Sequence, residues 1–207
     1  NSFRPVPIGW VGIPVKSFPA LIKDYVRRIN ELNADYIFIL DKPLVAKEFW
    51  EEIEKINIPV VWIDHHEIDR KEIPMFVSYY NPLFNENKTN EPVTTLCYQV
   101  VEGDEDLWLG VAGSIYDKFI PDFYFDFKKK YPDLAIDSEN AFDIFYRAPI
   151  GKIVRIFGFA LKDRITNVIS MLKFLMQVKN PYEVLEETSK NYSMHYRFEQ
   201  IKKTYDK

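Results

Sequence analysis

Residues 59–66 form the stretch Pro59-Val60-Val61-Trp62-Ile63-Asp64-His65-His66, in which an apolar run passes directly into a carboxylate and two imidazoles. Residues 36–41 repeat this arrangement, since Tyr-Ile-Phe-Ile-Leu is followed by Asp41. Such continuous apolar runs predict strands that are buried on both faces of a parallel sheet. Between them, residues 45–56 carry apolar side chains at helical spacing. This strand–helix–strand order predicts a βαβ unit.

The flanking segments continue the alternation of strand and helix. Residues 8–15 are short, apolar and rich in β-forming types, which predicts a strand. Ser17 is a suitable cap for a helix, and apolar residues at three- and four-residue spacing predict that this helix extends to Leu32. Further elements are expected in three places: a strand at residues 76–80 and helices at residues 94–101 and 107–116.

The second half of the chain has a different character. After Pro121 the pattern is helical, with long amphipathic segments at residues 153–177 and 181–203 and no strand pattern. The sequence therefore predicts an α/β protein, with a parallel-sheet domain and flanking helices in residues 1–150 and a helical C-terminal connector in residues 151–207. Because the first residue is Asn1 rather than Met, we expect this chain to be a piece of a longer protein.

Composition limits the possible classes of protein. No apolar run approaches the roughly 20 residues that cross a bilayer, so no membrane partner is expected. The single cysteine, Cys97, excludes an internal disulfide and indicates the cytoplasm. Residues 1–146 contain 15 basic and 25 acidic side chains, whereas residues 147–207 contain 12 and 6. This asymmetry fits a metal site beside an anion-binding surface, and it fits solvated helix faces equally well.

Candidate metal ligands follow both central strands. Parallel strands end at one edge of a sheet, so Asp41 should lie near the Asp64-His65-His66 group. Carboxylate oxygen and imidazole nitrogen together suit Mn²⁺, Zn²⁺ or Fe²⁺. The alternative for Asp41 is a helix N-cap. The third histidine, His195, is isolated in a basic helical stretch and is expected at the surface.

Asp64-His65-His66 after an apolar strand resembles the signature of the DHH phosphoesterase superfamily, and four further segments resemble that family in order. This superfamily includes RecJ-type exonucleases, nanoRNases, cyclic dinucleotide phosphodiesterases and family II pyrophosphatases. Residues 36–41 resemble its second motif, and residues 107–117, a Gly-containing helix ending in Asp117, resemble its fourth. Tyr79-Tyr80-Asn81-Pro82 and Pro92-Val93-Thr94-Thr95-Leu96 resemble segments of RecJ-like members.

The resemblance implies a two-metal hydrolase. Asp41 would bridge two Mn²⁺ (or Mg²⁺) ions, with His65 and Asp117 completing the ligands of one ion. Asp64 would orient a histidine, and His66 would face the scissile phosphate. The implied activity is that of a Mn-dependent phosphodiesterase or single-strand-specific exonuclease of the RecJ-like or nanoRNase branch. Its partners would be single-stranded DNA or RNA, short oligonucleotides and a replication protein.

Two departures from the family pattern leave alternatives open. The first motif, an Asp-x-Asp pair, has no counterpart in residues 1–35, where Asp24 lies in an expected helix. The Gly-rich motif of the second family domain, DHHA1, is also missing, since the last of the 7 glycines is Gly158. The alternatives are a Cdc45-like, catalytically inactive replication scaffold and a cyclic dinucleotide phosphodiesterase.

Overall fold

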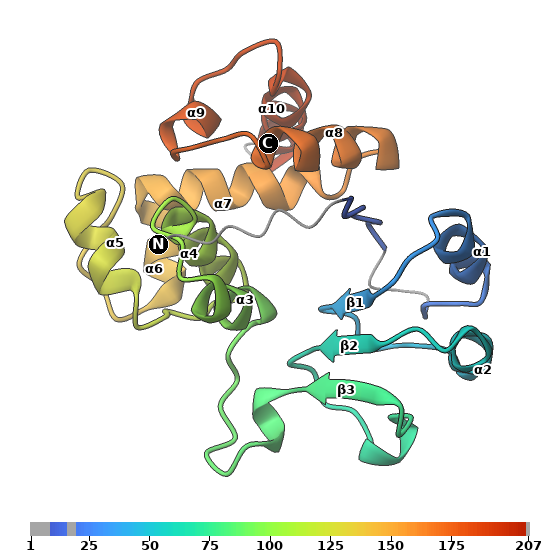
Figure 1. Ribbon diagram of the computed structural model, residues 1–207. Coiled ribbons are helices and arrows are strands. Elements are labelled where there is room, and N and C mark those ends of the chain that lie inside the picture. Colours follow the sequence, from blue (N-terminus) through green and yellow to red (C-terminus); the bar gives the residue numbers. More distant parts are fainter. Residues whose placement is uncertain (1–8, 16–19, 206–207) are drawn as a thin grey trace.

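The computed structural model describes residues 9–15 and 20–205, and a three-stranded parallel sheet forms its first part (Figure 1). The strands are β1 (Ile37–Leu40), β2 (Val60–Ile63) and β3 (Val77–Tyr80), in the order β1-β2-β3. The register runs from Ile37 opposite Val60 to Ile63 opposite Tyr80. Each of these predicted strands is confirmed and begins one residue later than expected.

Two helices cover one face of the sheet. They are α1 (Asp24–Glu31) and α2 (Lys47–Ile56), and their apolar side chains pack into one cluster with the inward-facing residues of the strands. In α2 the buried stripe is Phe49, Trp50 and Ile53, and the Trp50 and Trp62 rings lie 5.4 Å apart. The helix ends at Asn57, whose positive φ of 56° closes the last turn.

The opposite face of the sheet is open to solvent. On β1, Phe38 is 63% exposed and Leu40 is also exposed, as is Tyr80 on β3. The prediction that β1 is buried on both faces is therefore wrong. The physical reason is that α1 and α2 lie on the same face, while the later helices lie beyond the carboxyl ends of the strands (Figure 1).

The segment before α1 also differs from the prediction. Residues 9–15 form no strand, and Pro14 within them lacks the amide hydrogen that a sheet ladder needs. The predicted cap Ser17 lies outside the described residues. Leu21 is extended, because its backbone donates to Leu44 and accepts from Ala46 in an isolated parallel bridge. The helix consequently begins at Asp24 rather than near residue 18.

The rest of the chain is helical, as predicted, and no strand occurs within residues 81–205. Short 3-10 turns, η1 (Arg70–Glu72) and η2 (Pro82–Phe84), flank β3. The two long helices expected after residue 150 are each divided, because turns at residues 161–164 and 186–191 interrupt them. The helices are α3 (Val93–Val101), α4 (Leu107–Tyr116), α5 (Tyr124–Lys130), α6 (Ala141–Arg147), α7 (Pro149–Ala160), α8 (Ile165–Leu175), α9 (Tyr182–Leu185) and α10 (Tyr192–Tyr205).

A second hydrophobic cluster unites these helices around α7. It extends from Leu107 on α4 to Phe198 on α10. The predicted domain boundary between residues 150 and 151 falls inside α7. Buried residues of α7 on both sides of this boundary belong to the same cluster. The division into two domains stays a prediction. His195 is buried in this region, with Nε2 2.8 Å from the Val184 carbonyl oxygen, so its predicted surface position is wrong. None of the described helices is long and apolar enough to cross a membrane.

Candidate metal centre

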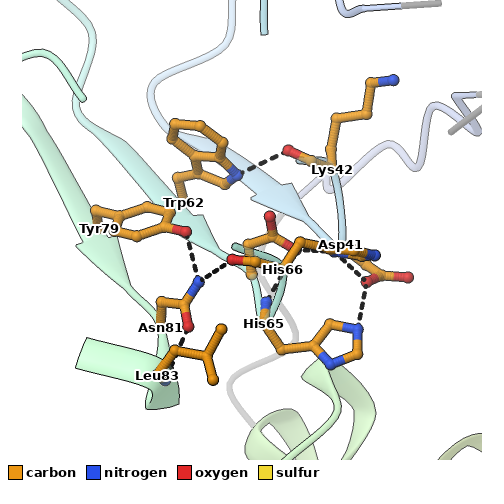
Figure 2. Close-up of polar contacts among 9 residues, drawn as sticks. Asp41, Lys42, Trp62, His65, His66, Tyr79, Asn81 and Leu83 are labelled. Atoms are coloured by element: carbon orange, nitrogen blue, oxygen red, sulfur yellow. Dashed lines mark hydrogen bonds and ion pairs between the residues drawn. The ribbon is translucent and has the colours of Figure 1, made fainter. Parts of the chain in front are cut away.

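The carboxyl ends of β1 and β2 bring the predicted ligands together (Figure 2). The sheet ladder continues one residue past each strand, since the Asp41 amide donates to the Ile63 carbonyl and the Asp64 amide donates to the Tyr80 carbonyl. At Asp41 the chain then turns sharply, with a positive φ of 54°. The N-cap of α2 is Ala46, so the alternative reading of Asp41 as the cap of that helix is wrong.

Asp41, His65 and His66 form a compact group of nitrogen and oxygen ligands. Their potential ligand atoms all lie within 4.8 Å of one another. His65 Nε2 lies 3.4 Å from Asp41 Oδ1, and His66 Nδ1 lies 3.8 Å from the same oxygen. Two ligands of a tetrahedral ion, each about 2.1 Å from it, lie about 3.4 Å apart. The Asp41–His65 pair therefore has the spacing that one divalent cation requires.

Asp64 acts from beneath this group. Its side chain is fully buried, and Oδ1 accepts a hydrogen bond from the His65 amide at 2.9 Å. The same oxygen lies 2.7 Å from His66 Nδ1. An ionised carboxylate only accepts, so Nδ1 carries the proton and Nε2 is the ring nitrogen of His66 left for a ligand or a substrate. The predicted position of Asp64 behind a histidine agrees with this geometry.

Three further side chains hold the loops that carry the ligands (Figure 2). Asn81 is buried, and its Nδ2 donates to the His66 carbonyl at 2.9 Å and to the Tyr79 hydroxyl at 2.8 Å. Trp62 Nε1 donates to the Lys42 carbonyl at 3.1 Å, which secures the turn after Asp41. Burial raises the pKa of Tyr79 to about 12. From the sequence, Asn81 is noted only within a segment that resembles RecJ-like members, and Trp62 is noted only as part of a strand.

Asp117, the remaining predicted ligand, lies outside the group of three but faces the same cavity. It follows α4, and with Asp41 it lines a cavity of about 230 Å³ that Thr94 and Tyr116 also border. Loss of hydration, and then the Asp41 carboxylate, raise the pKa of Asp117 above its usual range. Like charges that share a dehydrated space are stabilised by a cation.

The packing of α3 against α4 brings Asp117 to this position. A β-carbon at Gly113 would lie only 2.4 Å from Thr94 Cγ2, so these helices contact each other with no room for a side chain. Glycine alone permits such a close approach. Thr95 and Ser114 add a hydrogen bond of 2.7 Å across the same contact.

The donor set fits one divalent cation. A carboxylate oxygen and imidazole nitrogens, with a second carboxylate across the cavity, suit Mn²⁺, Zn²⁺ or Fe²⁺. Among residues 9–15 and 20–205, Asp41, His65 and His66 are the one compact group of three or more such side chains. Comparison with protein-family models, with curated proteins and with solved structures finds no match.

Proposed function

We propose that this chain is the metal-binding part of a DHH-type phosphodiesterase that hydrolyses single-stranded nucleic acid or short oligonucleotides. The observation that carries the proposal is the 3.4 Å approach of His65 Nε2 to Asp41 Oδ1 beside His66, which a buried carboxylate orients. A lone carboxylate after a strand has many structural uses. A carboxylate and two imidazoles that converge at the carboxyl edge of a parallel sheet are typical of a metal-dependent site.

Different residues would bind the metal ion and transfer protons. Asp41 and His65 would hold Mn²⁺ or Mg²⁺, with Asp117 approaching from the other side of the cavity. When bound, the ion would acidify a water molecule and neutralise charge on a phosphate. His66 presents Nε2 outward, since Nδ1 is engaged by Asp64, and can donate a proton to a phosphate oxygen or a leaving group. The buried Asp64 carboxylate would stabilise a positive charge on that ring.

A second candidate is a Cdc45-like replication scaffold that retains the site without catalysis. One observation favours it: the described residues supply one group of ligands, whereas two-metal hydrolysis needs two sets. A cyclic dinucleotide phosphodiesterase is the same chemistry on another substrate. We place all three in the cytoplasm, because Cys97 is a free thiol and no disulfide is available to the chain.

The test is Mn²⁺ binding and nucleotide release measured on the same protein. Mn²⁺ affinity follows from calorimetry, and release is measured with end-labelled single-stranded DNA, RNA and dinucleotides. We expect Asp41→Asn and His65→Ala to abolish Mn²⁺ binding, and His66→Ala to keep the ion but lose turnover. Asp35→Asn is the matched control, because the exposed Asp35 precedes β1 at the opposite end of the same strand.

The outcomes separate the candidates. Mn²⁺ binding without release of any nucleotide from the three substrates would reject the phosphodiesterase and leave the scaffold. Equal Mn²⁺ affinity in the wild type and in His65→Ala would contradict the assignment of the ligands.

A further inference from the structure

A band of exposed aromatic side chains begins next to Asp117. We call it the aromatic strip and define it as the exposed rings of Tyr116, Phe142 and Tyr146 together with the partly buried ring of Phe145. Phe142 and Tyr146 are 53% and 64% exposed, whereas the aromatic residues on the inner sides of neighbouring helices, such as Trp108, are fully buried. Neighbouring exposed apolar side chains mark interaction sites more often than singly scattered ones do.

The rings are arranged along one face of α6. Phe142 and Tyr146 are four residues apart in that helix, so they lie one turn apart on the same side. The Phe145 and Tyr146 rings contact each other edge to face, with centroids 4.8 Å apart. Phe142 and Tyr146 are each more than half exposed, so a flat ligand can reach their rings.

Two cations accompany the rings. The Lys118 ammonium lies 3.7 Å from the centroid of Phe145 and within 5.7 Å of those of Phe142 and Tyr116. The Arg155 guanidinium lies 5.9 Å from the Phe145 centroid and donates to the Phe145 carbonyl. Burial lowers the pKa of Arg155, because its charge has lost hydration. An anion that approached this guanidinium would restore part of the lost stabilisation.

The strip is continuous with the candidate metal centre. Tyr116 and Asp117 line the cavity that Asp41 borders, and Lys118 follows them directly in the chain. Lys118 in turn links Tyr116 on α4 to the rings on α6. A ligand that lies along the strip therefore reaches the Asp41–Asp117 cavity at one end.

We propose that the aromatic strip binds unpaired bases of a single-stranded nucleic acid, which stack on Phe142 and Tyr146 while Lys118 and Arg155 pair with its phosphates. Aromatic faces accept any base, and they accept it only when it is not paired in a duplex. Cations among the rings match the alternation of base and phosphate along a strand. This inference rests on the proposed function, since it names where the substrate strand would lie.

The experiment measures binding without catalysis. The whole chain is titrated against a fluorescent thymidine oligonucleotide in EDTA, and anisotropy gives the dissociation constant. We expect Phe142→Ala and Tyr146→Ala each to weaken binding roughly tenfold, because a base–aromatic stack contributes on that order. Tyr146→Phe should bind like the wild type. An abasic sugar–phosphate strand should bind the wild type as weakly as the thymidine strand binds the double variant, in which Phe142→Ala and Tyr146→Ala are combined.

The matched control is Tyr192→Ala. Tyr192 is 54% exposed and stacks on Tyr196 one turn along α10, so it is an exposed aromatic pair away from the strip. Its removal should leave affinity unchanged. Circular dichroism of every variant must match the wild type, so that a loss of binding is not a loss of fold.

Each remaining outcome decides one proposal. The proposal that the aromatic strip binds nucleic acid would be overturned if the wild type bound no oligonucleotide, or if wild type and double variant bound it with equal affinity. Either result would point to a protein partner for the strip. If strip variants bind normally while the chain hydrolyses nucleic acid with Mn²⁺, the strip is wrong and the phosphodiesterase stands. Strip-dependent binding without hydrolysis would keep the strip and reject the phosphodiesterase.

Discussion

Asn81 connects the loops that carry the candidate metal centre, and its replacement by alanine should destabilise the protein. The side chain makes three hydrogen bonds: to the His66 carbonyl, to the Tyr79 hydroxyl, and from the Leu83 amide at 2.9 Å. Each such bond contributes about 1 kcal/mol, and a buried partner left unsatisfied costs more. We therefore expect Asn81→Ala to lower the free energy of unfolding by about 3 kcal/mol.

Urea denaturation followed by circular dichroism measures this loss. With a denaturant slope of about 2 kcal/mol per molar urea, the midpoint should fall by about 1.5 M. Asn81→Asp is a sharper variant, because it keeps the acceptor for the Leu83 amide and turns an oxygen toward the His66 carbonyl. It should also destabilise the protein, although it has nearly the same shape as asparagine.

The control is Asn85→Ala, a few residues away on the surface. Exposed substitutions of this kind change stability by less than about 0.5 kcal/mol. If Asn81→Ala unfolded at the same urea concentration as Asn85→Ala, the account of Asn81 as a connector would be refuted. The connector role also predicts weaker Mn²⁺ binding by Asn81→Ala, since the His66 backbone loses an anchor.

Three further predictions concern pH, thiol chemistry and packing. Burial raises the pKa of Tyr79 to about 12 from 10.0 in the unfolded chain, so stability should be unaffected below pH 10 and fall toward pH 12. The free energy of unfolding should fall by about 2 kcal/mol over this pH range, after allowance for the partial exposure of the ring. Urea titrations at alkaline pH should show a smaller fall in Tyr79→Phe. Burial and then Asp41 raise the pKa of Cys97, so Asp41→Asn should speed its alkylation by iodoacetamide; an unchanged rate would contradict this. Gly113→Ala should lower the free energy of unfolding by about 2 kcal/mol, and Thr94→Ala should partly restore it, as thermal melts can check.

The sequence predicts the strands and the polar residues at their carboxyl ends well, because both depend on local pattern. A continuous apolar run ending in Asp41 or Asp64 is interpretable without knowledge of the rest of the chain, and parallel pairing brings the two ends together. The same pattern could not predict that Phe38 is exposed. Whether a face is covered depends on where distant helices pack, and apolarity alone does not indicate that.

Other features depend on single tertiary contacts. His195 is buried because α10 packs against α7 and the α9 turn offers the Val184 carbonyl, and neither is visible in a basic helical stretch. The resemblance indicated Asp117 as a ligand, but only packing at Gly113 sets its distance from Asp41. The role of Trp62 in securing the turn after Asp41 is visible only in the structure, because the hydrogen bond joins residues of two neighbouring strands.

Asp41 and Asp117 belong to two separately packed halves of the molecule, since the cluster around the sheet and the cluster around α7 share no residue. Their carboxylates line one cavity, where loss of hydration, and then the Asp41 charge, raise the pKa of Asp117. The folded state therefore loses stability as the pH rises from the ordinary pKa of an aspartate through the raised pKa of Asp117. A cation bound by both carboxylates would link the two halves of the molecule. The concentration of that cation would therefore determine how cooperatively the two halves unfold.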